Sequence, residues 1–271
     1  MRQGAAHAPG VEALAGIVAS VCASSIRDGD RPEESLRGIE GFMGLHPLES
    51  RKGRCFKLDT CSMPALFVKI LQDSSKAANE AGFAKRLNEM GISCPKALFV
   101  EGQVLVRLYI EGKTAAEELD MAIGWGDVGY ASSLCSKVGA MLAEAHNLDS
   151  RNGNGLVLND LNLRNFIVSG ANSISLIDLA DAGDGDQGKD LGSLVVHILT
   201  HRPAFTVASE AMADAAYRGY FGTAGWPGAR AKAVQGLKEA LLEAEARRHS
   251  PGLSELARGY LKHLEETVKG M

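Results

Sequence analysis

The chain has 271 residues, which is enough for one large domain or two small ones. Its 45% hydrophobic and 23% charged residues are typical of a globular protein and exclude a disordered tail, a collagen-like rod and a coiled coil. The net charge of −4 argues against a broad nucleic-acid-binding surface. No apolar run reaches the roughly 18–20 residues that would span a bilayer.

The first 40 residues are predicted to be a helical extension. Apolar residues follow helical spacing, namely Val11, Leu14, Ile17, Val18 and Val21. A secretory signal is the alternative, but Glu12 interrupts the basic flank and the apolar stretch is short. The five cysteines are scattered without a C-x-x-C pair, so we expect buried, reduced thiols in a cytosolic protein.

The pattern then changes to strands around one helix. It predicts strands at Arg54–Thr60, Ala65–Leu71 and Val104–Ile110, and a helix that is capped by Ser74 or Ser75 and ends near Met90. Further on, the spacing of apolar residues predicts a long helix up to Leu148. Three short apolar segments follow, at 155–158, 165–168 and 174–178, and from Asp190 onward the chain is predicted to be mostly helical.

Lys69 lies inside an otherwise apolar strand, where an ammonium group is costly unless it is paired. The following helix offers Glu80 as a partner. A strand lysine held by a helix glutamate would aim a cation at a phosphate. The alternative is an exposed edge-strand lysine and a solvated glutamate.

Polar residues also interrupt the apolar segments of LVLNDLNLRNFIV (156–168) and ISLID (174–178). If 165–168 and 174–178 pair as a hairpin, Asn165 and Asp178 fall at the same open end, where opposed side chains lie within about 5 Å. An amide oxygen and a carboxylate suit a hard cation such as Mg²⁺. Asp160 could accept a proton from an attacking hydroxyl. Loop-capping Asp and Asn side chains are the alternative.

Five polar residues follow one another along the chain in the order and spacing of the functional residues of kinases: Lys69, Glu80, Asp160, Asn165 and Asp178. The chain therefore resembles the protein-kinase-like superfamily, over roughly residues 38–200. The resemblance implies an α+β, two-lobed fold with a small antiparallel-sheet N-lobe and a mostly helical C-lobe. We therefore expect a helical extension at 1–40, an N-lobe at 41–112 and a C-lobe with the catalytic loop at 113–271.

The resemblance also implies roles for individual residues. Those expected to bind ATP are Lys69, Glu80, the backbone of Leu108 and Ile110, and the phosphate loop at Arg51, Lys52 and Gly53. Those expected to be catalytic are Asp160 and Asn162, and those expected to hold Mg²⁺ are Asn165 and Asp178.

Only about a dozen residues separate Asp178 from the phrase KDLGSL (189–194), which leaves no room for a peptide-docking activation segment. Together with DLNLRNFIV and LIDLADA, this phrase is most similar to bacterial lipopolysaccharide (Kdo and heptose) kinases. The RIO-type and KEOPS-associated small kinases, and the aminoglycoside and choline kinases, share the same frame. The expected reaction is phosphorylation of a hydroxyl, on a lipid-linked saccharide or on protein, in the cytoplasm, with peripheral contact at the inner membrane face left open.

Three departures from the kinase pattern keep a nucleotide-binding pseudokinase or partner-binding module as an alternative, and the residue at the gatekeeper position is also unusual. Leu158 replaces the usual histidine two residues before Asp160, and Ala180 replaces the glycine of D-F-G. Gly53 is the lone glycine of the expected phosphate loop, and Arg107 falls at the gatekeeper position beside adenine.

Two other groups of polar residues are interpreted as structurally ordinary. The acidic segment that contains Asp181, Asp184 and Asp186 is expected to be a solvated loop, because it lacks the EF-hand register. The histidines, His146 among them, show no metal-ligand grouping and are expected to occupy ordinary helix or loop positions.

Overall fold

The computed structural model describes residues 9–28, 32–37, 42–48, 54–61, 63–148, 150–151, 154–170, 173–224, 228–248 and 252–270. The chain divides into two compact units. The first comprises Met1–Glu89, Cys94–Glu111 and Asp178–Asp181, and the second comprises Met90–Ser93, Gly112–Ile177 and Ala182–Met271.

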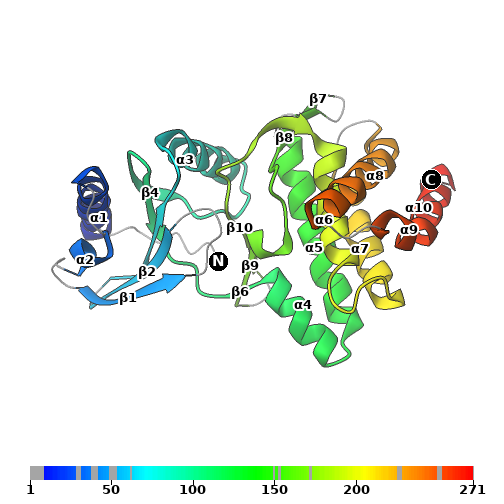
Figure 1. The fold of residues 1–271 in the computed structure, drawn as a ribbon, viewed down its shortest axis with the longest axis horizontal. Helices are drawn as coiled ribbons and strands as arrows, with labels where there is room; N and C mark the ends of the chain where they lie inside the picture. The colour runs from blue at the N-terminus through cyan, green and yellow to red at the C-terminus, as the bar shows by residue number, and fades with distance from the viewer. Residues whose placement is uncertain are drawn as a thin grey trace. The chain divides into compact units, whose positions relative to one another are not determined.

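The first unit contains a five-stranded antiparallel sheet in the order β1-β2-β3-β5-β4 (Figure 1). Its strands are β1 (Phe42–Leu48), β2 (Arg54–Thr60), β3 (Leu66–Ile70), β4 (Ala97–Glu101) and β5 (Val104–Leu108). The strands predicted from the sequence correspond to β2, β3 and β5. No strand was predicted at β4, which lies just after Pro95 and whose residues are mostly half-buried.

Helices cover both faces of this sheet. The helix α1 (Pro9–Asp28) is the predicted amphipathic helix, and it buries Leu14 and Val18 against a core that includes Val104 and Val106 of β5. The short helix α2 (Pro32–Leu36) follows it and packs against it. Because side chains alternate along a strand, Leu105 faces the opposite side, where it packs against α3 (Ser74–Glu89).

The helix α3 begins one residue after its capping side chain. Asp73 Oδ1 accepts hydrogen bonds from the Lys76 backbone N–H (2.9 Å) and from the Ser75 hydroxyl (2.5 Å). Capping by Ser74 or Ser75 was therefore a wrong prediction. A carboxylate at this position also interacts favourably with the positive end of the helix dipole, and these hydrogen bonds lower the pKa of Asp73.

The second unit is mostly helical. Its helices are α4 (Ala115–Gly124), α5 (Val128–Asn147), α6 (Gln187–Leu199), α7 (Val207–Thr223), α8 (Ala229–Arg248), α9 (Leu253–Leu256) and α10 (Arg258–Gly270). Its strands are β6 (Lys113–Thr114), β7 (Ser150–Arg151), β8 (Asn154–Val157), β9 (Phe166–Ser169), β10 (Ser173–Leu176) and β11 (Gly183–Asp186). No helix in the described part of the chain is long and apolar enough to cross a membrane.

The predicted hairpin forms: β9 and β10 pair antiparallel, with Phe166 opposite Leu176. The expected solvated loop after it is wrong in part, because 183–186 form β11 and pair with β8. Asp186 then caps α6 by accepting hydrogen bonds from the backbone N–H groups of Gly188 (2.7 Å) and Lys189 (3.3 Å).

Glycines allow the long helices of this unit to approach closely. A Cβ added to Gly219 of α7 would collide with the backbone carbonyl of Ser136 in α5. Likewise, a Cβ at Gly236 of α8 would collide with the carbonyl of Gly188 in α6. The pairs α5–α7 and α6–α8 therefore pack backbone against backbone.

The close approach predicts opposite effects for two substitutions in one helix. Gly219→Ala should lower the free energy of unfolding by about 1–3 kcal/mol, because α5 and α7 must separate to admit the methyl group. Gly222→Ala is the matched control, since a Cβ there meets nothing within 4 Å. It should stabilise the chain by up to about 1 kcal/mol through helix propensity. Urea unfolding of both variants is the measurement, and equal effects would contradict the packing described.

The cysteines partly match the expectation. Cys22, Cys55, Cys94 and Cys135 are buried, whereas Cys61 is exposed. Burial raises the pKa of the Cys135 thiol to about 12. These buried thiols therefore act as small core residues.

Candidate active-site residues

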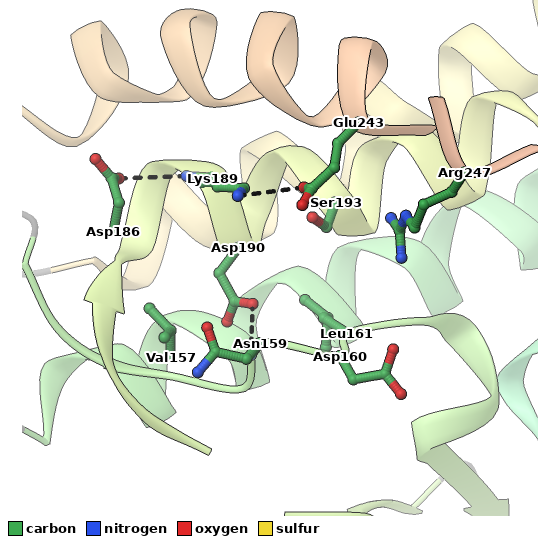
Figure 2. Close-up of a pocket in the computed structure, with 10 residues that line it drawn as sticks. All are labelled: Val157, Asn159, Asp160, Leu161, Asp186, Lys189, Asp190, Ser193, Glu243 and Arg247. Atoms are coloured by element: carbon green, nitrogen blue, oxygen red, sulfur yellow. Dashed lines mark hydrogen bonds and ion pairs between the residues drawn. The ribbon is translucent and has the colours of Figure 1, made fainter. Parts of the chain in front are cut away.

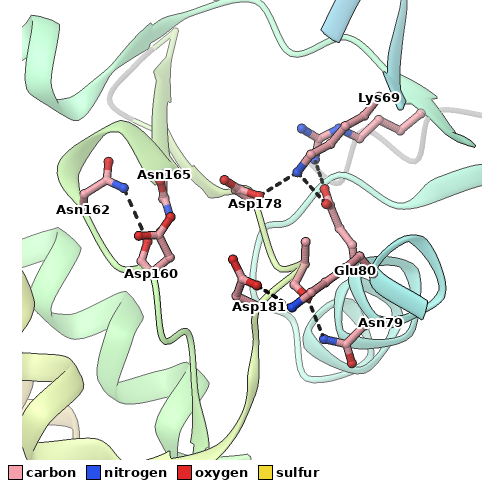
Figure 3. A network of polar contacts seen from close by, with 11 residues as sticks. Lys69, Asn79, Glu80, Asp160, Asn162, Asn165, Asp178 and Asp181 are labelled. Carbon is pink, nitrogen blue, oxygen red and sulfur yellow. Dashed lines mark hydrogen bonds and ion pairs between the residues drawn. The ribbon is translucent and has the colours of Figure 1, made fainter. Parts of the chain in front are cut away.

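Lys69 of β3 stands at the centre of a buried ion-pair network in the first unit (Figure 3). Its Nζ lies 2.7 Å from Glu80 Oε2 and 2.6 Å from Asp178 Oδ1. Lys69 and Glu80 are only 5% and 2% exposed, so the alternative of an exposed lysine and a solvated glutamate is wrong. Lys69 lies opposite Leu105 in the sheet and therefore faces α3, which carries Glu80.

Two opposing effects set the pKa of Lys69. Burial alone would lower the pKa of the ammonium group, but the negative charges of Glu80 and Asp178 and their hydrogen bonds outweigh it, so the pKa is raised. The side chain therefore carries a full positive charge at neutral pH. A buried, permanently charged cation of this kind is suited to binding a polyphosphate.

Arg107, at the expected gatekeeper position, is a second buried cation on the same carboxylate. Its Nη1 lies 3.8 Å from Glu80 Oε1, and its guanidinium carbon lies 4.3 Å from the centre of the Phe67 ring. The Glu80 Oε1 atom makes no hydrogen bond within the described residues. Glu80 thus lies between two cations, with the shorter contact to Lys69.

The segment that follows Asp178 is attached to the helix α3. Asn79 Nδ2 donates to the Ala180 carbonyl (3.0 Å), and Lys76 Nζ pairs with Asp181 Oδ1 (2.5 Å). The Ala180 side chain packs in the apolar cluster beneath α3, which gives a structural reason for alanine where kinases have glycine. Asp178 itself adopts a left-handed backbone conformation with φ of 62°, which Asp and Asn tolerate better than most residues.

The predicted catalytic loop lies in the second unit, and two asparagines hold it. Asn165 Nδ2 donates to the Asp160 carbonyl (2.8 Å), and Asn162 Nδ2 makes a longer contact with the same oxygen (3.4 Å). Asn162 Oδ1 also caps the short 3₁₀ turn η1 (Leu163–Asn165) by accepting from the Arg164 N–H (2.9 Å). Figure 3 shows both amides directed at the backbone of Asp160. Asn162 is therefore placed to fix the loop.

Asp190, which has no role predicted from the sequence, anchors the same loop from α6. Its carboxylate accepts the backbone N–H groups of Leu158 (2.8 Å) and Asn159 (3.2 Å). It also lies 3.1 Å from His146 Nε2, while His146 Nδ1 lies 2.6 Å from the Tyr220 hydroxyl. His146 lies in the helix α5, as expected, and is completely buried. Asp190 thus holds the backbone of Leu158. The apolar side chain of Leu158 cannot form hydrogen bonds, as the histidine that is usual at this position could.

The remaining expected nucleotide-binding residues are placed as follows. Leu108 ends β5, opposite Leu66, and the Tyr109 N–H donates to the Ala65 carbonyl (2.9 Å). Ile110 follows and is half-buried. The expected phosphate loop, Arg51, Lys52 and Gly53, lies outside the described residues.

Asn165 of the second unit and Asp178 of the first each carry an oxygen of the kind that binds a hard divalent cation. The side-chain nitrogen of Asn165 donates to the Asp160 carbonyl, so the side-chain oxygen is the atom that Asn165 could offer to a cation. Asp178 carries a carboxylate, and the preceding Ile177 donates its N–H to the Asn165 backbone carbonyl (2.8 Å). Amide and carboxylate oxygens are the ligands that Mg²⁺ prefers.

Comparison with known protein families gives one match. Residues 151–231 match the phosphotransferase enzyme family. No curated protein sequence matches the chain significantly.

Solved structures match over most of the chain. An amicoumacin kinase solved with AMP-PNP and Ca²⁺ is 13% identical with a TM-score of 0.59, covering 90% of this chain and 96% of that one. A Plasmodium vivax ethanolamine kinase is 10% identical with a TM-score of 0.56, covering 86% and 80%. A macrolide 2'-phosphotransferase from Brachybacterium faecium is 15% identical with a TM-score of 0.51, covering 89% and 97%.

These similarities establish the class of fold. The expected α+β protein-kinase-like fold, with an antiparallel sheet in the N-terminal part and helices in the C-terminal part, is confirmed. The family match and the similar structures support a phosphotransferase enzyme. They do not single out the lipopolysaccharide kinases among the branches of this fold.

Proposed function

We propose that the protein transfers the γ-phosphoryl group of ATP to a hydroxyl group of a small acceptor. The observation that carries this proposal is the ion-pair set formed by the buried Lys69 and Glu80 with the half-buried Asp178. Burying an ammonium group and a carboxylate costs free energy, and a fold that needed only stability would do as well with apolar residues. The retained charges are explained by a ligand that they bind.

Each residue has a role in the proposed reaction. Lys69, oriented by Glu80, binds the α- and β-phosphates, and the backbone of Leu108 and Ile110 binds adenine. Asn165 and Asp178 would hold Mg²⁺, which neutralises charge on the transferring phosphoryl group. We assign the phosphate loop to Arg51, Lys52 and Gly53.

Asp160 orients the acceptor hydroxyl and accepts its proton. The acceptor oxygen forms a bond to the γ-phosphorus while the bond from that phosphorus to the β–γ bridging oxygen breaks, and ADP leaves. Asn162 and Asn165, through the Asp160 carbonyl, keep the loop in place for this step. Holding the reacting groups in line is the main contribution that a kinase makes to the rate.

For the acceptor we propose a saccharide hydroxyl of the lipopolysaccharide type, in a cytoplasmic enzyme that contacts the inner membrane face. The phrases DLNLRNFIV, LIDLADA and KDLGSL support this choice. The proteins of similar structure have names that denote amicoumacin, ethanolamine and macrolides, so other small hydroxyl compounds belong in the same screen. Transfer to protein would instead indicate a RIO-like kinase.

A thermal-shift titration tests nucleotide binding. We expect ATP to raise the melting temperature in the presence of Mg²⁺, because a ligand that binds only the folded chain stabilises it. Asp178→Asn should remove the dependence on Mg²⁺, whereas the exposed Asp184→Asn is the matched control and should keep it. A shift that is independent of Mg²⁺ in the wild type would favour a pseudokinase, and no shift would contradict the proposal.

A phosphate-transfer screen then identifies the acceptor. Purified protein with labelled ATP and Mg²⁺ is offered saccharides, small alcohols, ethanolamine and protein. We expect label in a small hydroxyl compound. Label only in protein, or in nothing while ATP binds, would reject the small-molecule assignment.

A further inference from the structure

A pocket of about 200 Å³ lies in the second unit, beside the catalytic loop (Figure 2). Its walls come from that loop, from α6 and from α8, and Asp160 is one of the residues that line it. The volume is below the roughly 300–1,000 Å³ of sites for drug-sized ligands, so the pocket suits a small group. Because the proposed general base Asp160 lines this pocket, we assign the pocket to the acceptor.

The pocket contains four carboxylates, and the contacts of three of them are as follows. Asp190 accepts hydrogen bonds from the catalytic loop, as described above. Asp186 caps α6 and lies 3.5 Å from Lys232 Nζ. Glu243 of α8 lies 3.2 Å from Lys189 Nζ, so these two charges neutralise each other. The excess of acidic residues therefore does not by itself indicate a cationic ligand.

Arg247, near the end of α8, differs from the other charged residues of the pocket. It is exposed and forms no ion pair with any residue in the described ranges. In Figure 2, Arg247 and Asp160 lie toward one end of the pocket, and Asp186 lies toward the other. A guanidinium presents a planar fork of N–H donors that matches a carboxylate or a phosphate.

We propose that Arg247 binds an anionic group, a carboxylate or a phosphate, on the acceptor whose hydroxyl lies at Asp160. The acceptor is then an acidic hydroxyl compound, such as a sugar acid or a sugar phosphate. The reaction at the hydroxyl rests on the proposed function. Binding of the anionic group by Arg247 does not, because it requires neither ATP nor catalysis.

The test compares ligands that differ mainly in charge. The probes are glucose, glucosamine, glucuronate and glucose 6-phosphate, each measured for phosphorylation with Mg-ATP and for binding by calorimetry without nucleotide. The wild type should favour at least one anionic probe over glucose by about tenfold or more, as expected for a charge-assisted hydrogen-bonded pair. Glucosamine should be the poorest probe.

Variants of Arg247 decide whether this residue is responsible. Arg247→Gln should abolish the preference, Arg247→Lys should keep part of it, and Arg247→Glu should favour glucosamine. Arg258→Gln is the control, because that exposed arginine lies in α10 and pairs with Glu255. It should behave as the wild type.

The phosphorylation and binding measurements distinguish a failure of the proposed reaction from a failure of the proposed anion site. If no probe is phosphorylated but an anionic probe binds the wild type and not Arg247→Gln, the anion site stands and the proposed reaction fails for these acceptors. A wild type that prefers glucose or glucosamine overturns the anion site. So does equal binding by the wild type and Arg247→Gln, or an absence of binding to both.

Discussion

Asp160→Asn should lower the rate of phosphoryl transfer by about 10²–10⁴-fold, which is the usual contribution of a positioned general base. The amide keeps the size of the side chain but cannot accept the proton of the acceptor hydroxyl. Both Asn162 and Asn165 contact the backbone carbonyl of Asp160, not its side chain, so the loop should keep its conformation. Steady-state kinetics with the best acceptor of the screen measures the effect.

Two controls accompany this variant. Asp184→Asn removes an exposed carboxylate of the same unit and should leave the rate unchanged. The thermal shift with Mg-ATP should be the same for Asp160→Asn as for the wild type, because we assign Asp160 to the acceptor and not to the nucleotide. A fall in rate that is matched by loss of the nucleotide-induced shift would contradict that assignment.

The buried ion-pair network could be predicted because its members leave a signal in the sequence. Lys69 is the one charged residue within an apolar strand, and a partner was therefore needed. Glu80 lies in the helix that follows this strand, eleven positions after Lys69, where it can reach the lysine. Asp178 was predicted only as a metal ligand, at the end of an apolar segment that pairs as a hairpin, and its ion pair with Lys69 was not predicted.

The anchor of the catalytic loop could not be predicted in the same way. Asp190, His146 and Tyr220 belong to three different helices, and His146 lies 44 and 74 positions from its two partners. No local pattern relates positions so far apart, since only the packing of α5, α6 and α7 brings them together. The fully buried histidine could be recognised only once that packing was known.

The strand β11 was missed for a different physical reason. Its residues, GDGD (183–186), are half-buried or exposed and have none of the β-branched or aromatic side chains that mark a strand. The segment is a strand because its backbone pairs with β8. A Cβ at Gly185 would lie only 2.6 Å from a methyl carbon of Val157, so close approach to β8 favours glycine there.

Lys69→Met should abolish nucleotide binding and also destabilise the first unit. The substitution leaves Glu80 buried without its nearest cation, and breaking a buried pair in this way costs about 3–5 kcal/mol. Adding Glu80→Gln should recover part of that stability, since the remaining buried charge is removed. Nucleotide binding should stay lost in the double variant. Urea unfolding and the thermal shift with Mg-ATP provide the two measurements.

The exposed pair of Lys85 and Glu89 on the same helix α3 is the matched control. Its side chains are 72% and 63% exposed with a 4.0 Å separation, and such surface pairs contribute at most about 1 kcal/mol. Lys85→Met should therefore have little effect on unfolding or on nucleotide binding. Similar losses for Lys85→Met and Lys69→Met would mean that burial does not distinguish the two lysines.

The effect of Lys69→Met on stability should not change between pH 7 and pH 9. The pKa of Lys69 is raised in the folded chain, so the folded state binds the proton more tightly than the unfolded state does. Its contribution is then complete below the unfolded value of about 10.4 and is lost only as the pH rises through the higher folded value. A difference in unfolding free energy that fell steadily from pH 7 to pH 9 would show that Lys69 loses its proton in that range. The two carboxylates would then not be holding the charge that the proposed phosphate binding requires.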